Sequence, residues 1–96
     1  MTSPQRQERQ DVRYPHNLPV SLKLDRQEIQ VRSENISLGG ILLSSAFPIP
    51  EGTTVDLAIG APHLTLLSAR GKVIRVQPKL SGTFAVAIVF ECLSLA

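Results

Sequence analysis

The chain has 96 residues, of which 43% are hydrophobic, and its formal net charge of +2 is small. This length admits one domain with one modest core, and the hydrophobic content argues against disorder throughout. No apolar run approaches the ~18 residues of a membrane-spanning helix, and the first ten residues lack the apolar stretch of a secretory signal. The single cysteine, Cys92, excludes an internal disulfide framework. These features predict a cytoplasmic domain without direct membrane insertion.

Residues 1–17 are polar and contain almost no large apolar side chain. Such a segment cannot build a core of its own, and Pro15 and Pro19 disfavour a helix that continues from it. The composition therefore predicts a flexible N-terminal arm. This arm carries Arg9 and Arg13 in an R-x-x-x-R pattern.

From Leu18 onward, apolar and polar residues alternate with a period of two, which is typical of half-buried strands. The alternation predicts six strands, at residues 18–24, 29–32, 41–46, 54–59, 64–76 and 84–90. A kink or bulge is expected at Gly71 in the fifth strand. No stretch is typical of a helix, so an all-β domain follows. A small antiparallel β-barrel of six strands at residues 18–91 fits best, because closure removes exposed strand edges, and a sandwich is the alternative. Residues 92–96 are predicted to form a short C-terminal tail.

The last predicted strand is apolar on both faces. One face carries large apolar residues, and the other carries Ala85, Ala87 and Val89. A strand that is apolar on both faces needs cover on both. Either a second copy of the chain covers the outer face, which makes a homodimer through the last strand, or the small alanines tolerate exposure. Cys92 is predicted to be a buried or half-buried small hydrophobe at the end of this strand.

Arg9 and Arg13 form the first constellation that can carry binding chemistry. They stand four residues apart, at the junction of the arm and the barrel. The planar guanidinium group suits phosphate and the O6/N7 edge of guanine, because both accept two hydrogen bonds from it. Taken alone, the pair is interpreted as two solvated arginines on a flexible tail.

A second constellation lies between the second and third predicted strands. Asn35, Ser37 and Gly40 form an N-x-S-x-x-G pattern, with Gly39 inside it. The asparagine and the serine offer short hydrogen-bonding side chains, and the glycines allow positive φ and a close approach of the backbone to a ligand. Taken alone, this pattern is interpreted as an ordinary turn between two strands.

In this order and spacing, the two patterns resemble those of the PilZ domain, a bacterial family that binds the second messenger cyclic di-GMP. That family is marked by R-x-x-x-R ahead of a six-stranded barrel and by (D/N)-x-S-x-x-G after its second strand. The resemblance covers roughly residues 9–91. It implies that the arginines bind phosphates and a guanine edge, that the asparagine and serine bind the other side of the ligand, and that the glycines keep the surface free of bulk. The implied ligand-binding residues are Arg9, Arg13, Asn35, Ser37, Gly39 and Gly40.

The resemblance implies a receptor that pins its arm to the barrel when cyclic di-GMP binds, and so changes the surface shown to a downstream protein. The alternative is a PilZ-like adaptor that binds protein and no nucleotide. Members of the family often continue into a C-terminal helix, and this chain stops before one. Glu8 stands where some members carry a further arginine and bind a stacked pair of ligands, so one ligand per site is favoured. The regulated output is not specified.

The sequence argues against an enzyme. No G-x-S-x-G pattern is present, and no histidine has a reasoned place beside Ser37. His16, His63 and Cys92 show no metal-ligand spacing, so neither a metal nor a cofactor is expected.

Nucleic-acid binding, the competing function of small barrels, is disfavoured as well. It needs exposed aromatic side chains for base stacking, and the chain has only one tyrosine and three phenylalanines. The local basic cluster of Arg70, Lys72 and Arg75 is interpreted as a solvated strand face. The scattered carboxylates, among them Glu34 and Asp56, are interpreted as solvated too.

Overall fold

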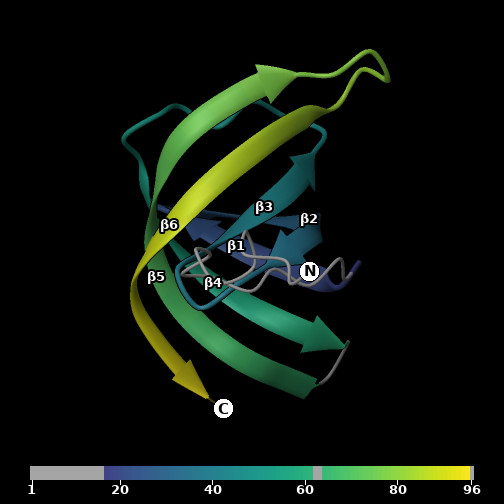
Figure 1. Cartoon of the computed structure of the whole chain (residues 1–96). Coiled ribbons are helices and arrows are strands. Elements are labelled where there is room, and N and C mark those ends of the chain that lie inside the picture. Colours follow the sequence, from purple (N-terminus) through teal and green to yellow (C-terminus); the bar gives the residue numbers. More distant parts are fainter. Residues whose placement is uncertain (1–16, 62–63, 96) are drawn as a thin grey trace, which may run out of the picture.

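The protein is a closed antiparallel barrel of six strands in the order β1-β2-β3-β6-β5-β4 (Figure 1). The computed structural model describes residues 17–61 and 64–95, and no helix occurs in these ranges. The strands are β1 (Pro19–Leu24), β2 (Gln27–Ile36), β3 (Gly40–Ser45), β4 (Thr54–Ala61), β5 (Leu64–Pro78) and β6 (Phe84–Leu95). The predicted barrel is thus confirmed, and the sandwich is excluded.

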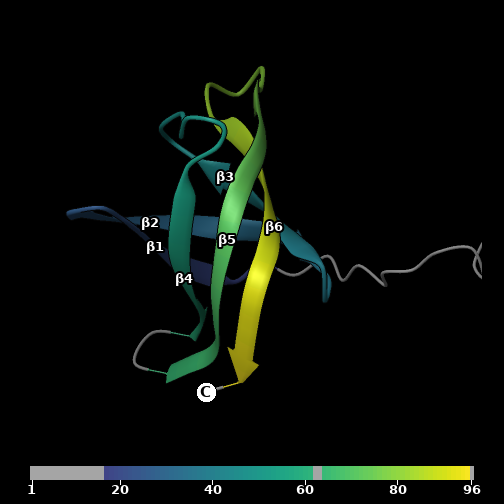
Figure 2. The ribbon, with the colours of Figure 1, turned by 90° about the vertical axis from the view of Figure 1, so that its left-hand side faces the viewer.

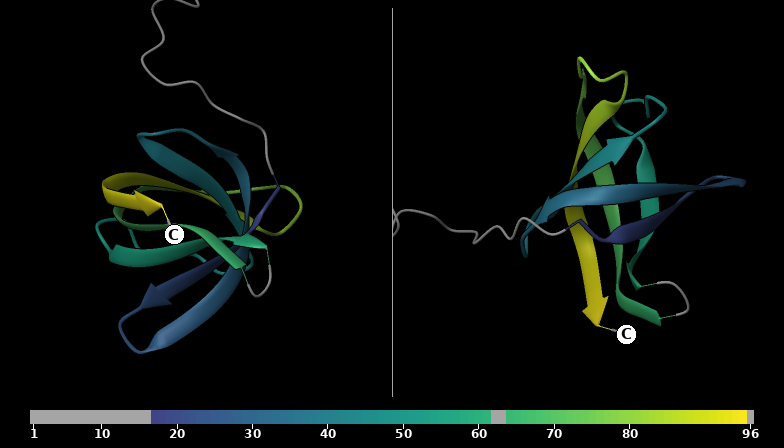
Figure 3. Two further views of the ribbon diagram at one scale, coloured as in Figure 1. Left: turned by 90° about the horizontal axis from the view of Figure 1, so that it is seen from below. Right: turned by 90° about the vertical axis from the view of Figure 1, so that its right-hand side faces the viewer.

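The barrel is strongly skewed. Seen from the side, the long strands β5 and β6 run next to each other, while the β1–β2 hairpin crosses them at a steep angle (Figures 2 and 3). Each strand pairs antiparallel with its neighbour on either side. Every strand therefore has a neighbour along both edges, which satisfies most backbone donors and acceptors within the sheet.

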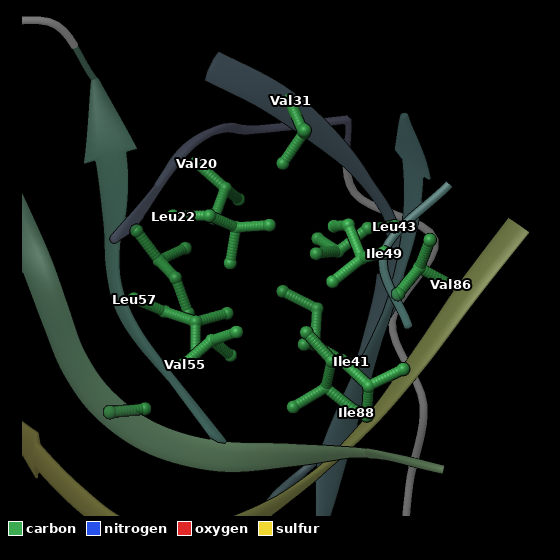
Figure 4. Close-up of a cluster of buried hydrophobic side chains, with 13 residues drawn as sticks. Val20, Leu22, Val31, Ile41, Leu43, Ile49, Val55, Leu57, Val86 and Ile88 are labelled. Carbon is green, nitrogen blue, oxygen red and sulfur yellow. The ribbon is translucent and has the colours of Figure 1, made fainter. Parts of the chain in front are cut away.

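Alternation along the strands places one set of side chains inside the barrel. In β1, Val20 and Leu22 are fully buried, whereas Lys23 is exposed. Figure 4 shows the buried aliphatic side chains converging from opposite walls on a common interior. The core comprises Val20, Leu22, Val31, Ile41, Leu43, Ile49, Val55, Leu57, Ile59, Ala69, Val73, Val86 and Ile88. Burial of such a side chain stabilises the fold by roughly 1.5–3 kcal/mol, so this set drives closure.

One core residue comes from a loop. Ile49 lies between β3 and β4, in a stretch that the sequence predicts as a loop, yet only 3% of it is exposed. The end of this loop is tied to β5, because the Gly52 N–H donates to the Val73 carbonyl (2.7 Å) and the Val73 N–H donates to the Thr53 carbonyl (2.9 Å). The loop therefore contributes to the core as well as connecting two strands.

Two strands run further than the alternation predicts. β2 continues to Ile36, past its predicted end at residue 32, because β3 pairs with this extension. β6 continues to Leu95, so that most of the predicted tail pairs with β5. Cys92 is exposed, which corrects the prediction that it is buried or half-buried. The reason is its register, since it pairs with Arg70 and cross-strand neighbours share a face.

A bulge lies beside Gly71, but in β6 rather than in the fifth strand as predicted, because Arg70 pairs with Cys92 and Gly71 with Phe90, which leaves Glu91 as the extra residue. The extra residue of β5 itself is Ile74, between Val73 and Arg75. The register between β5 and β6 shifts between Arg70 and Gly71. A Cβ atom added at Gly71 would lie 2.6 Å from both Ile88 Cγ2 and the Val89 carbonyl oxygen. The backbones of β5 and β6 therefore approach so closely here that only glycine fits without a shift.

Replacement of Leu43 by alanine tests the position of the core. Leu43 is fully buried, so we expect Leu43→Ala to lower the free energy of unfolding by about 2–5 kcal/mol in a denaturant titration. Leu80 is fully exposed in the turn between β5 and β6, and Leu80→Ala is the matched control, with an expected change within about 0.5 kcal/mol. Equal losses in the two variants would contradict this core.

Candidate functional site

The chain enters the barrel beside β2 through hydrogen bonds made by Asn17 and Leu18. The Leu18 N–H donates to Ser33 Oγ (2.9 Å), and the Ser33 N–H donates back to the Leu18 carbonyl (2.9 Å). The guanidinium of Arg32 donates to the side-chain oxygen of Asn17 and to its carbonyl. The segment that follows the R-x-x-x-R pattern is thereby anchored to β2. The two arginines of the pattern lie outside the described residues.

Asn35 follows a β-bulge in β2. Ser33 pairs with Leu43, but Asn35 pairs with Leu42, so Glu34 is an extra residue that no residue of β3 opposes in the register. Leu43 is in the core, whereas Leu42 is half-buried on the outer face. Because cross-strand neighbours share a face, Asn35 belongs to the outer face of the barrel, beside Leu42.

The turn between β2 and β3 is organised by the buried side chain of Ser37. Its hydroxyl accepts a hydrogen bond from the Gly39 N–H (3.2 Å) and donates one to the Gly40 carbonyl (3.4 Å), while the Ser37 N–H donates to the same carbonyl (2.9 Å). The Phe90 N–H donates to the Gly39 carbonyl (2.9 Å), which fastens the turn to β6. Ser37 therefore shapes the turn, and its side chain is buried.

Gly40 has a role in packing that the sequence does not reveal. The motif glycines allow positive φ, but neither Gly39 nor Gly40 is among the described glycines that adopt it. A Cβ atom at Gly40 would instead lie 2.3 Å from the Ile88 carbonyl oxygen, closer than any side chain tolerates. The motif glycine thus allows the backbones of β3 and β6 to meet.

A groove of about 240 Å³ lies directly beside this turn, on the outer faces of β3, β6 and β5. Its lining includes Leu42, Ile74, Arg75, Ala87 and Val89, together with the motif glycines. Two of the apolar side chains are substantially exposed, Ile74 to 54% and Val89 to 43%. This is the outer face that the sequence shows to be apolar, and its cover by a second copy stays a prediction.

Arg75 lines this groove, although the sequence predicts that it lies on a solvated strand face. Arg70 lies on the same strand and forms an ion pair with Asp56, in which the Arg70 Nε is 3.0 Å from the carboxylate. That hydrogen bond, followed by the attraction of the charge, raises the pKa of Arg70. Arg75 pairs with Ala87 and lines the groove instead. No sequence signal separates the two arginines, since only the strand register decides their surroundings.

The carboxylates predicted to be solvated include two that are paired. Asp56 binds Arg70 at the surface, and Glu34 forms an ion pair with Lys79 in which both side chains are about two-thirds buried. His16 and His63, which are not expected to bind a metal, lie outside the described residues. Within 17–61 and 64–95, no three His, Cys, Asp or Glu side chains gather as they would around a metal ion.

A second hollow, of about 570 Å³, lies at the other end of β2. It is formed by the β1–β2 turn and the loop after β3, and its lining includes Leu24, Ile29 and Phe47. Phe47 is 62% exposed. This hollow is apolar and carries none of the motif residues, so it is not part of the site at the Ser37 turn.

Comparison with known proteins agrees with this geometry. The family model of the PilZ domain matches residues 7–95. Among solved structures, the inhibitor of motility MotI/DgrA of Bacillus subtilis is similar, with a TM-score of 0.76 and 26% sequence identity. The similarity covers 93% of this chain and 44% of that protein, so this chain spans less than half of its length. The comparison with curated protein sequences gives no match.

Substitution of Gly40 tests the packing of the motif. We expect Gly40→Ala to destabilise the protein by about 1–3 kcal/mol, because the new methyl group must push β3 away from Ile88. The NMR signals of the Ile88 and Val89 amides should shift with it. Gly82→Ala is the control, since open space surrounds Gly82 and only its positive φ opposes alanine. Unshifted β6 amides in the Gly40 variant would contradict the close approach.

Proposed function

This chain belongs to the PilZ domain family, and on that premise we propose that it is a receptor for cyclic di-GMP, which binds between the N-terminal arm and the outer face of the barrel. The observation that carries the proposal is that four features of the candidate site lie together at one end of β2. The anchor of the arm, the bulge at Asn35, the Ser37 turn and the groove edged by Arg75 all meet there.

The anchor makes it feasible for the arm to reach the groove. An extended chain spans at most ~3.6 Å per residue, so the backbone of Arg13 lies within about 14 Å of Asn17. Leu18 and Ser33 exchange hydrogen bonds two residues before Asn35 on β2. The corresponding limit for Arg9 is about 29 Å. Tethers of these lengths allow both arginines to reach Asn35 and the turn, as the proposal requires.

The chemistry of the groove suits a guanine nucleotide with two phosphates. We assign the phosphates and one guanine edge to Arg9 and Arg13, and hydrogen bonds from the barrel to Asn35 and Ser37. Gly39 and Gly40 leave room for the ligand to approach the backbone. The exposed apolar side chains of Ile74 and Val89 offer contact to a base. Arg75 adds a cation that carries no ion pair with a described carboxylate.

Ligand binding in this position links the arm to the barrel. The arm sequence is polar and cannot form a core alone, so a dianion that contacts both parts supplies the energy to order it. The surface shown to a downstream protein then differs between the free and bound states. The regulatory effect needs no catalysis and no metal.

Calorimetric titration with cyclic di-GMP tests the receptor directly. We expect micromolar or tighter binding with one ligand per site, and no heat with GTP. Because a charge-assisted hydrogen bond contributes roughly 1.5–3 kcal/mol, Arg9→Ala or Arg13→Ala should weaken binding by about tenfold or more. Arg26→Ala is the control, since Arg26 lies in the β1–β2 turn at the other end of β2. Absence of heat from the unaltered protein would reject the receptor.

Arg75 provides a second test that separates two arginines of one strand. Arg75→Ala removes a cation from the groove and should weaken binding by roughly fivefold to tenfold. Arg70→Ala is the matched control, because Arg70 lies on the same strand, does not line the groove and is paired with Asp56. Equal affinities of the two variants would remove Arg75 from the site.

A protein-binding adaptor is the second candidate. The exposed Phe47 beside the apolar hollow of Leu24 and Ile29 favours it, because such patches mark interaction surfaces. This function needs neither Arg9 nor Arg13. The same titration distinguishes the two candidates, since an adaptor of this kind takes up no cyclic di-GMP.

A further inference from the structure

The bulge in β2 decides which face of the barrel carries Asn35. With Glu34 as the extra residue, Asn35 pairs with Leu42 on the outer face. Without the bulge, the regular register would place Glu34 opposite Leu42 and Asn35 opposite Ile41, whose side chain is in the core. A shift of one residue turns every following side chain to the other face. Binding through Asn35 therefore depends on whatever keeps the bulge in place.

Glu34 itself is held from outside its own hairpin. Its carboxylate forms an ion pair with Lys79 Nζ at the start of the turn after β5. In the strand order, β3 and β6 separate β2 from β5, so this pair joins two elements that are not neighbours in the sheet. The exposed fractions of the two side chains are 32% and 33%, which reduces the screening of the pair by water.

The Lys79 end of the pair is a fixed point. The Lys79 N–H donates to the Thr83 carbonyl (2.8 Å), and the Gly82 N–H donates to the Lys79 carbonyl (3.1 Å). These bonds close the turn between β5 and β6. An ion pair with one end on a closed turn restrains the other end, which is the extra residue of the bulge.

We propose that the Glu34–Lys79 ion pair is a positioning clamp that holds the β2 bulge, and with it Asn35, on the face of the candidate ligand groove. Neither residue is assigned a contact with the ligand. The consequence for affinity rests on the proposed binding of cyclic di-GMP, whereas the placement of Asn35 does not.

The physical reason for the clamp is the cost of the bulge. An extra residue interrupts the backbone ladder, and competing registers are close in energy unless something selects one of them. A partly buried carboxylate that loses its cation is left with an uncompensated charge. The ion pair therefore favours the register in which Glu34 is free to turn toward Lys79. It also links the β2 side of the groove to the strand that carries Arg75.

The test combines NMR of the free protein with calorimetry, in the full chain. Glu34→Gln and Lys79→Met should each weaken the cross-strand NOEs between Asn35 and Leu42. Each should also weaken binding of cyclic di-GMP by about threefold to tenfold. The exchanged pair, Glu34→Lys with Lys79→Glu, restores the attraction and should recover both signals. A role limited to general stability would lower the melting temperature of the single variants and leave the Asn35–Leu42 NOEs of the folded protein unchanged, so melting curves of all variants are recorded beside the titrations.

Asp56→Asn is the matched control, because it breaks the exposed ion pair with Arg70 outside the groove and should leave the NOEs and the affinity unchanged. Unaltered Asn35–Leu42 NOEs in both single variants would overturn the clamp. Failure of the exchanged pair to recover them would do the same. If the unaltered protein takes up no cyclic di-GMP, the proposed function fails, and the NOEs of the free protein still decide the clamp.

Discussion

The close approach of β6 to both of its neighbours is the constraint on which the barrel depends. Gly40 of β3 and Gly71 of β5 face the same two residues of β6, Ile88 and Val89, from opposite sides. At each contact, a Cβ atom would come within 2.6 Å of β6 or nearer. Three backbones are therefore drawn together at this point, and the sheet can close around its aliphatic core only if both glycines are present.

The candidate site is a consequence of that closure. Where three strands meet without bulky side chains between them, the outer surface is hollowed, and the groove lies over Gly40 and Ala87. The same glycine that completes the motif thus brings β3 onto β6 and leaves space above the sheet. At Gly40, the packing of the two strands and the proposed approach of a ligand depend on the same absence of a side chain. Asn35, in contrast, pairs with Leu42 on the outer face of the barrel.

Charged side chains of the same type take different roles because the register sorts them. Arg70 and Arg75 are five positions apart on β5, yet the first is paired with Asp56 and the second lines the groove. Glu34 and Asp56 are both paired, but of these two pairs only that of Glu34 is partly withdrawn from water, and it links β2 to the turn after β5, a strand that is not its neighbour in the sheet. The electrostatic character of the site therefore comes from topology as much as from composition.

Period-two alternation and the position of turn residues were sufficient to predict six strands and a closed barrel, because alternation requires one buried face and short antiparallel strands avoid open edges by closing. The motif order was sufficient to indicate the family. Tertiary structure alone decided the rest. Pairing partners extended β2 and β6 beyond their alternating stretches, and register exposed Cys92. The bulge at Glu34 set the face of Asn35, an ion pair between residues distant in the sequence engaged Lys79, and the register placed Arg75 at the groove. These features depend on which residues pair with each other across the sheet. The alternation of apolar and polar residues along one strand does not specify its pairing partners.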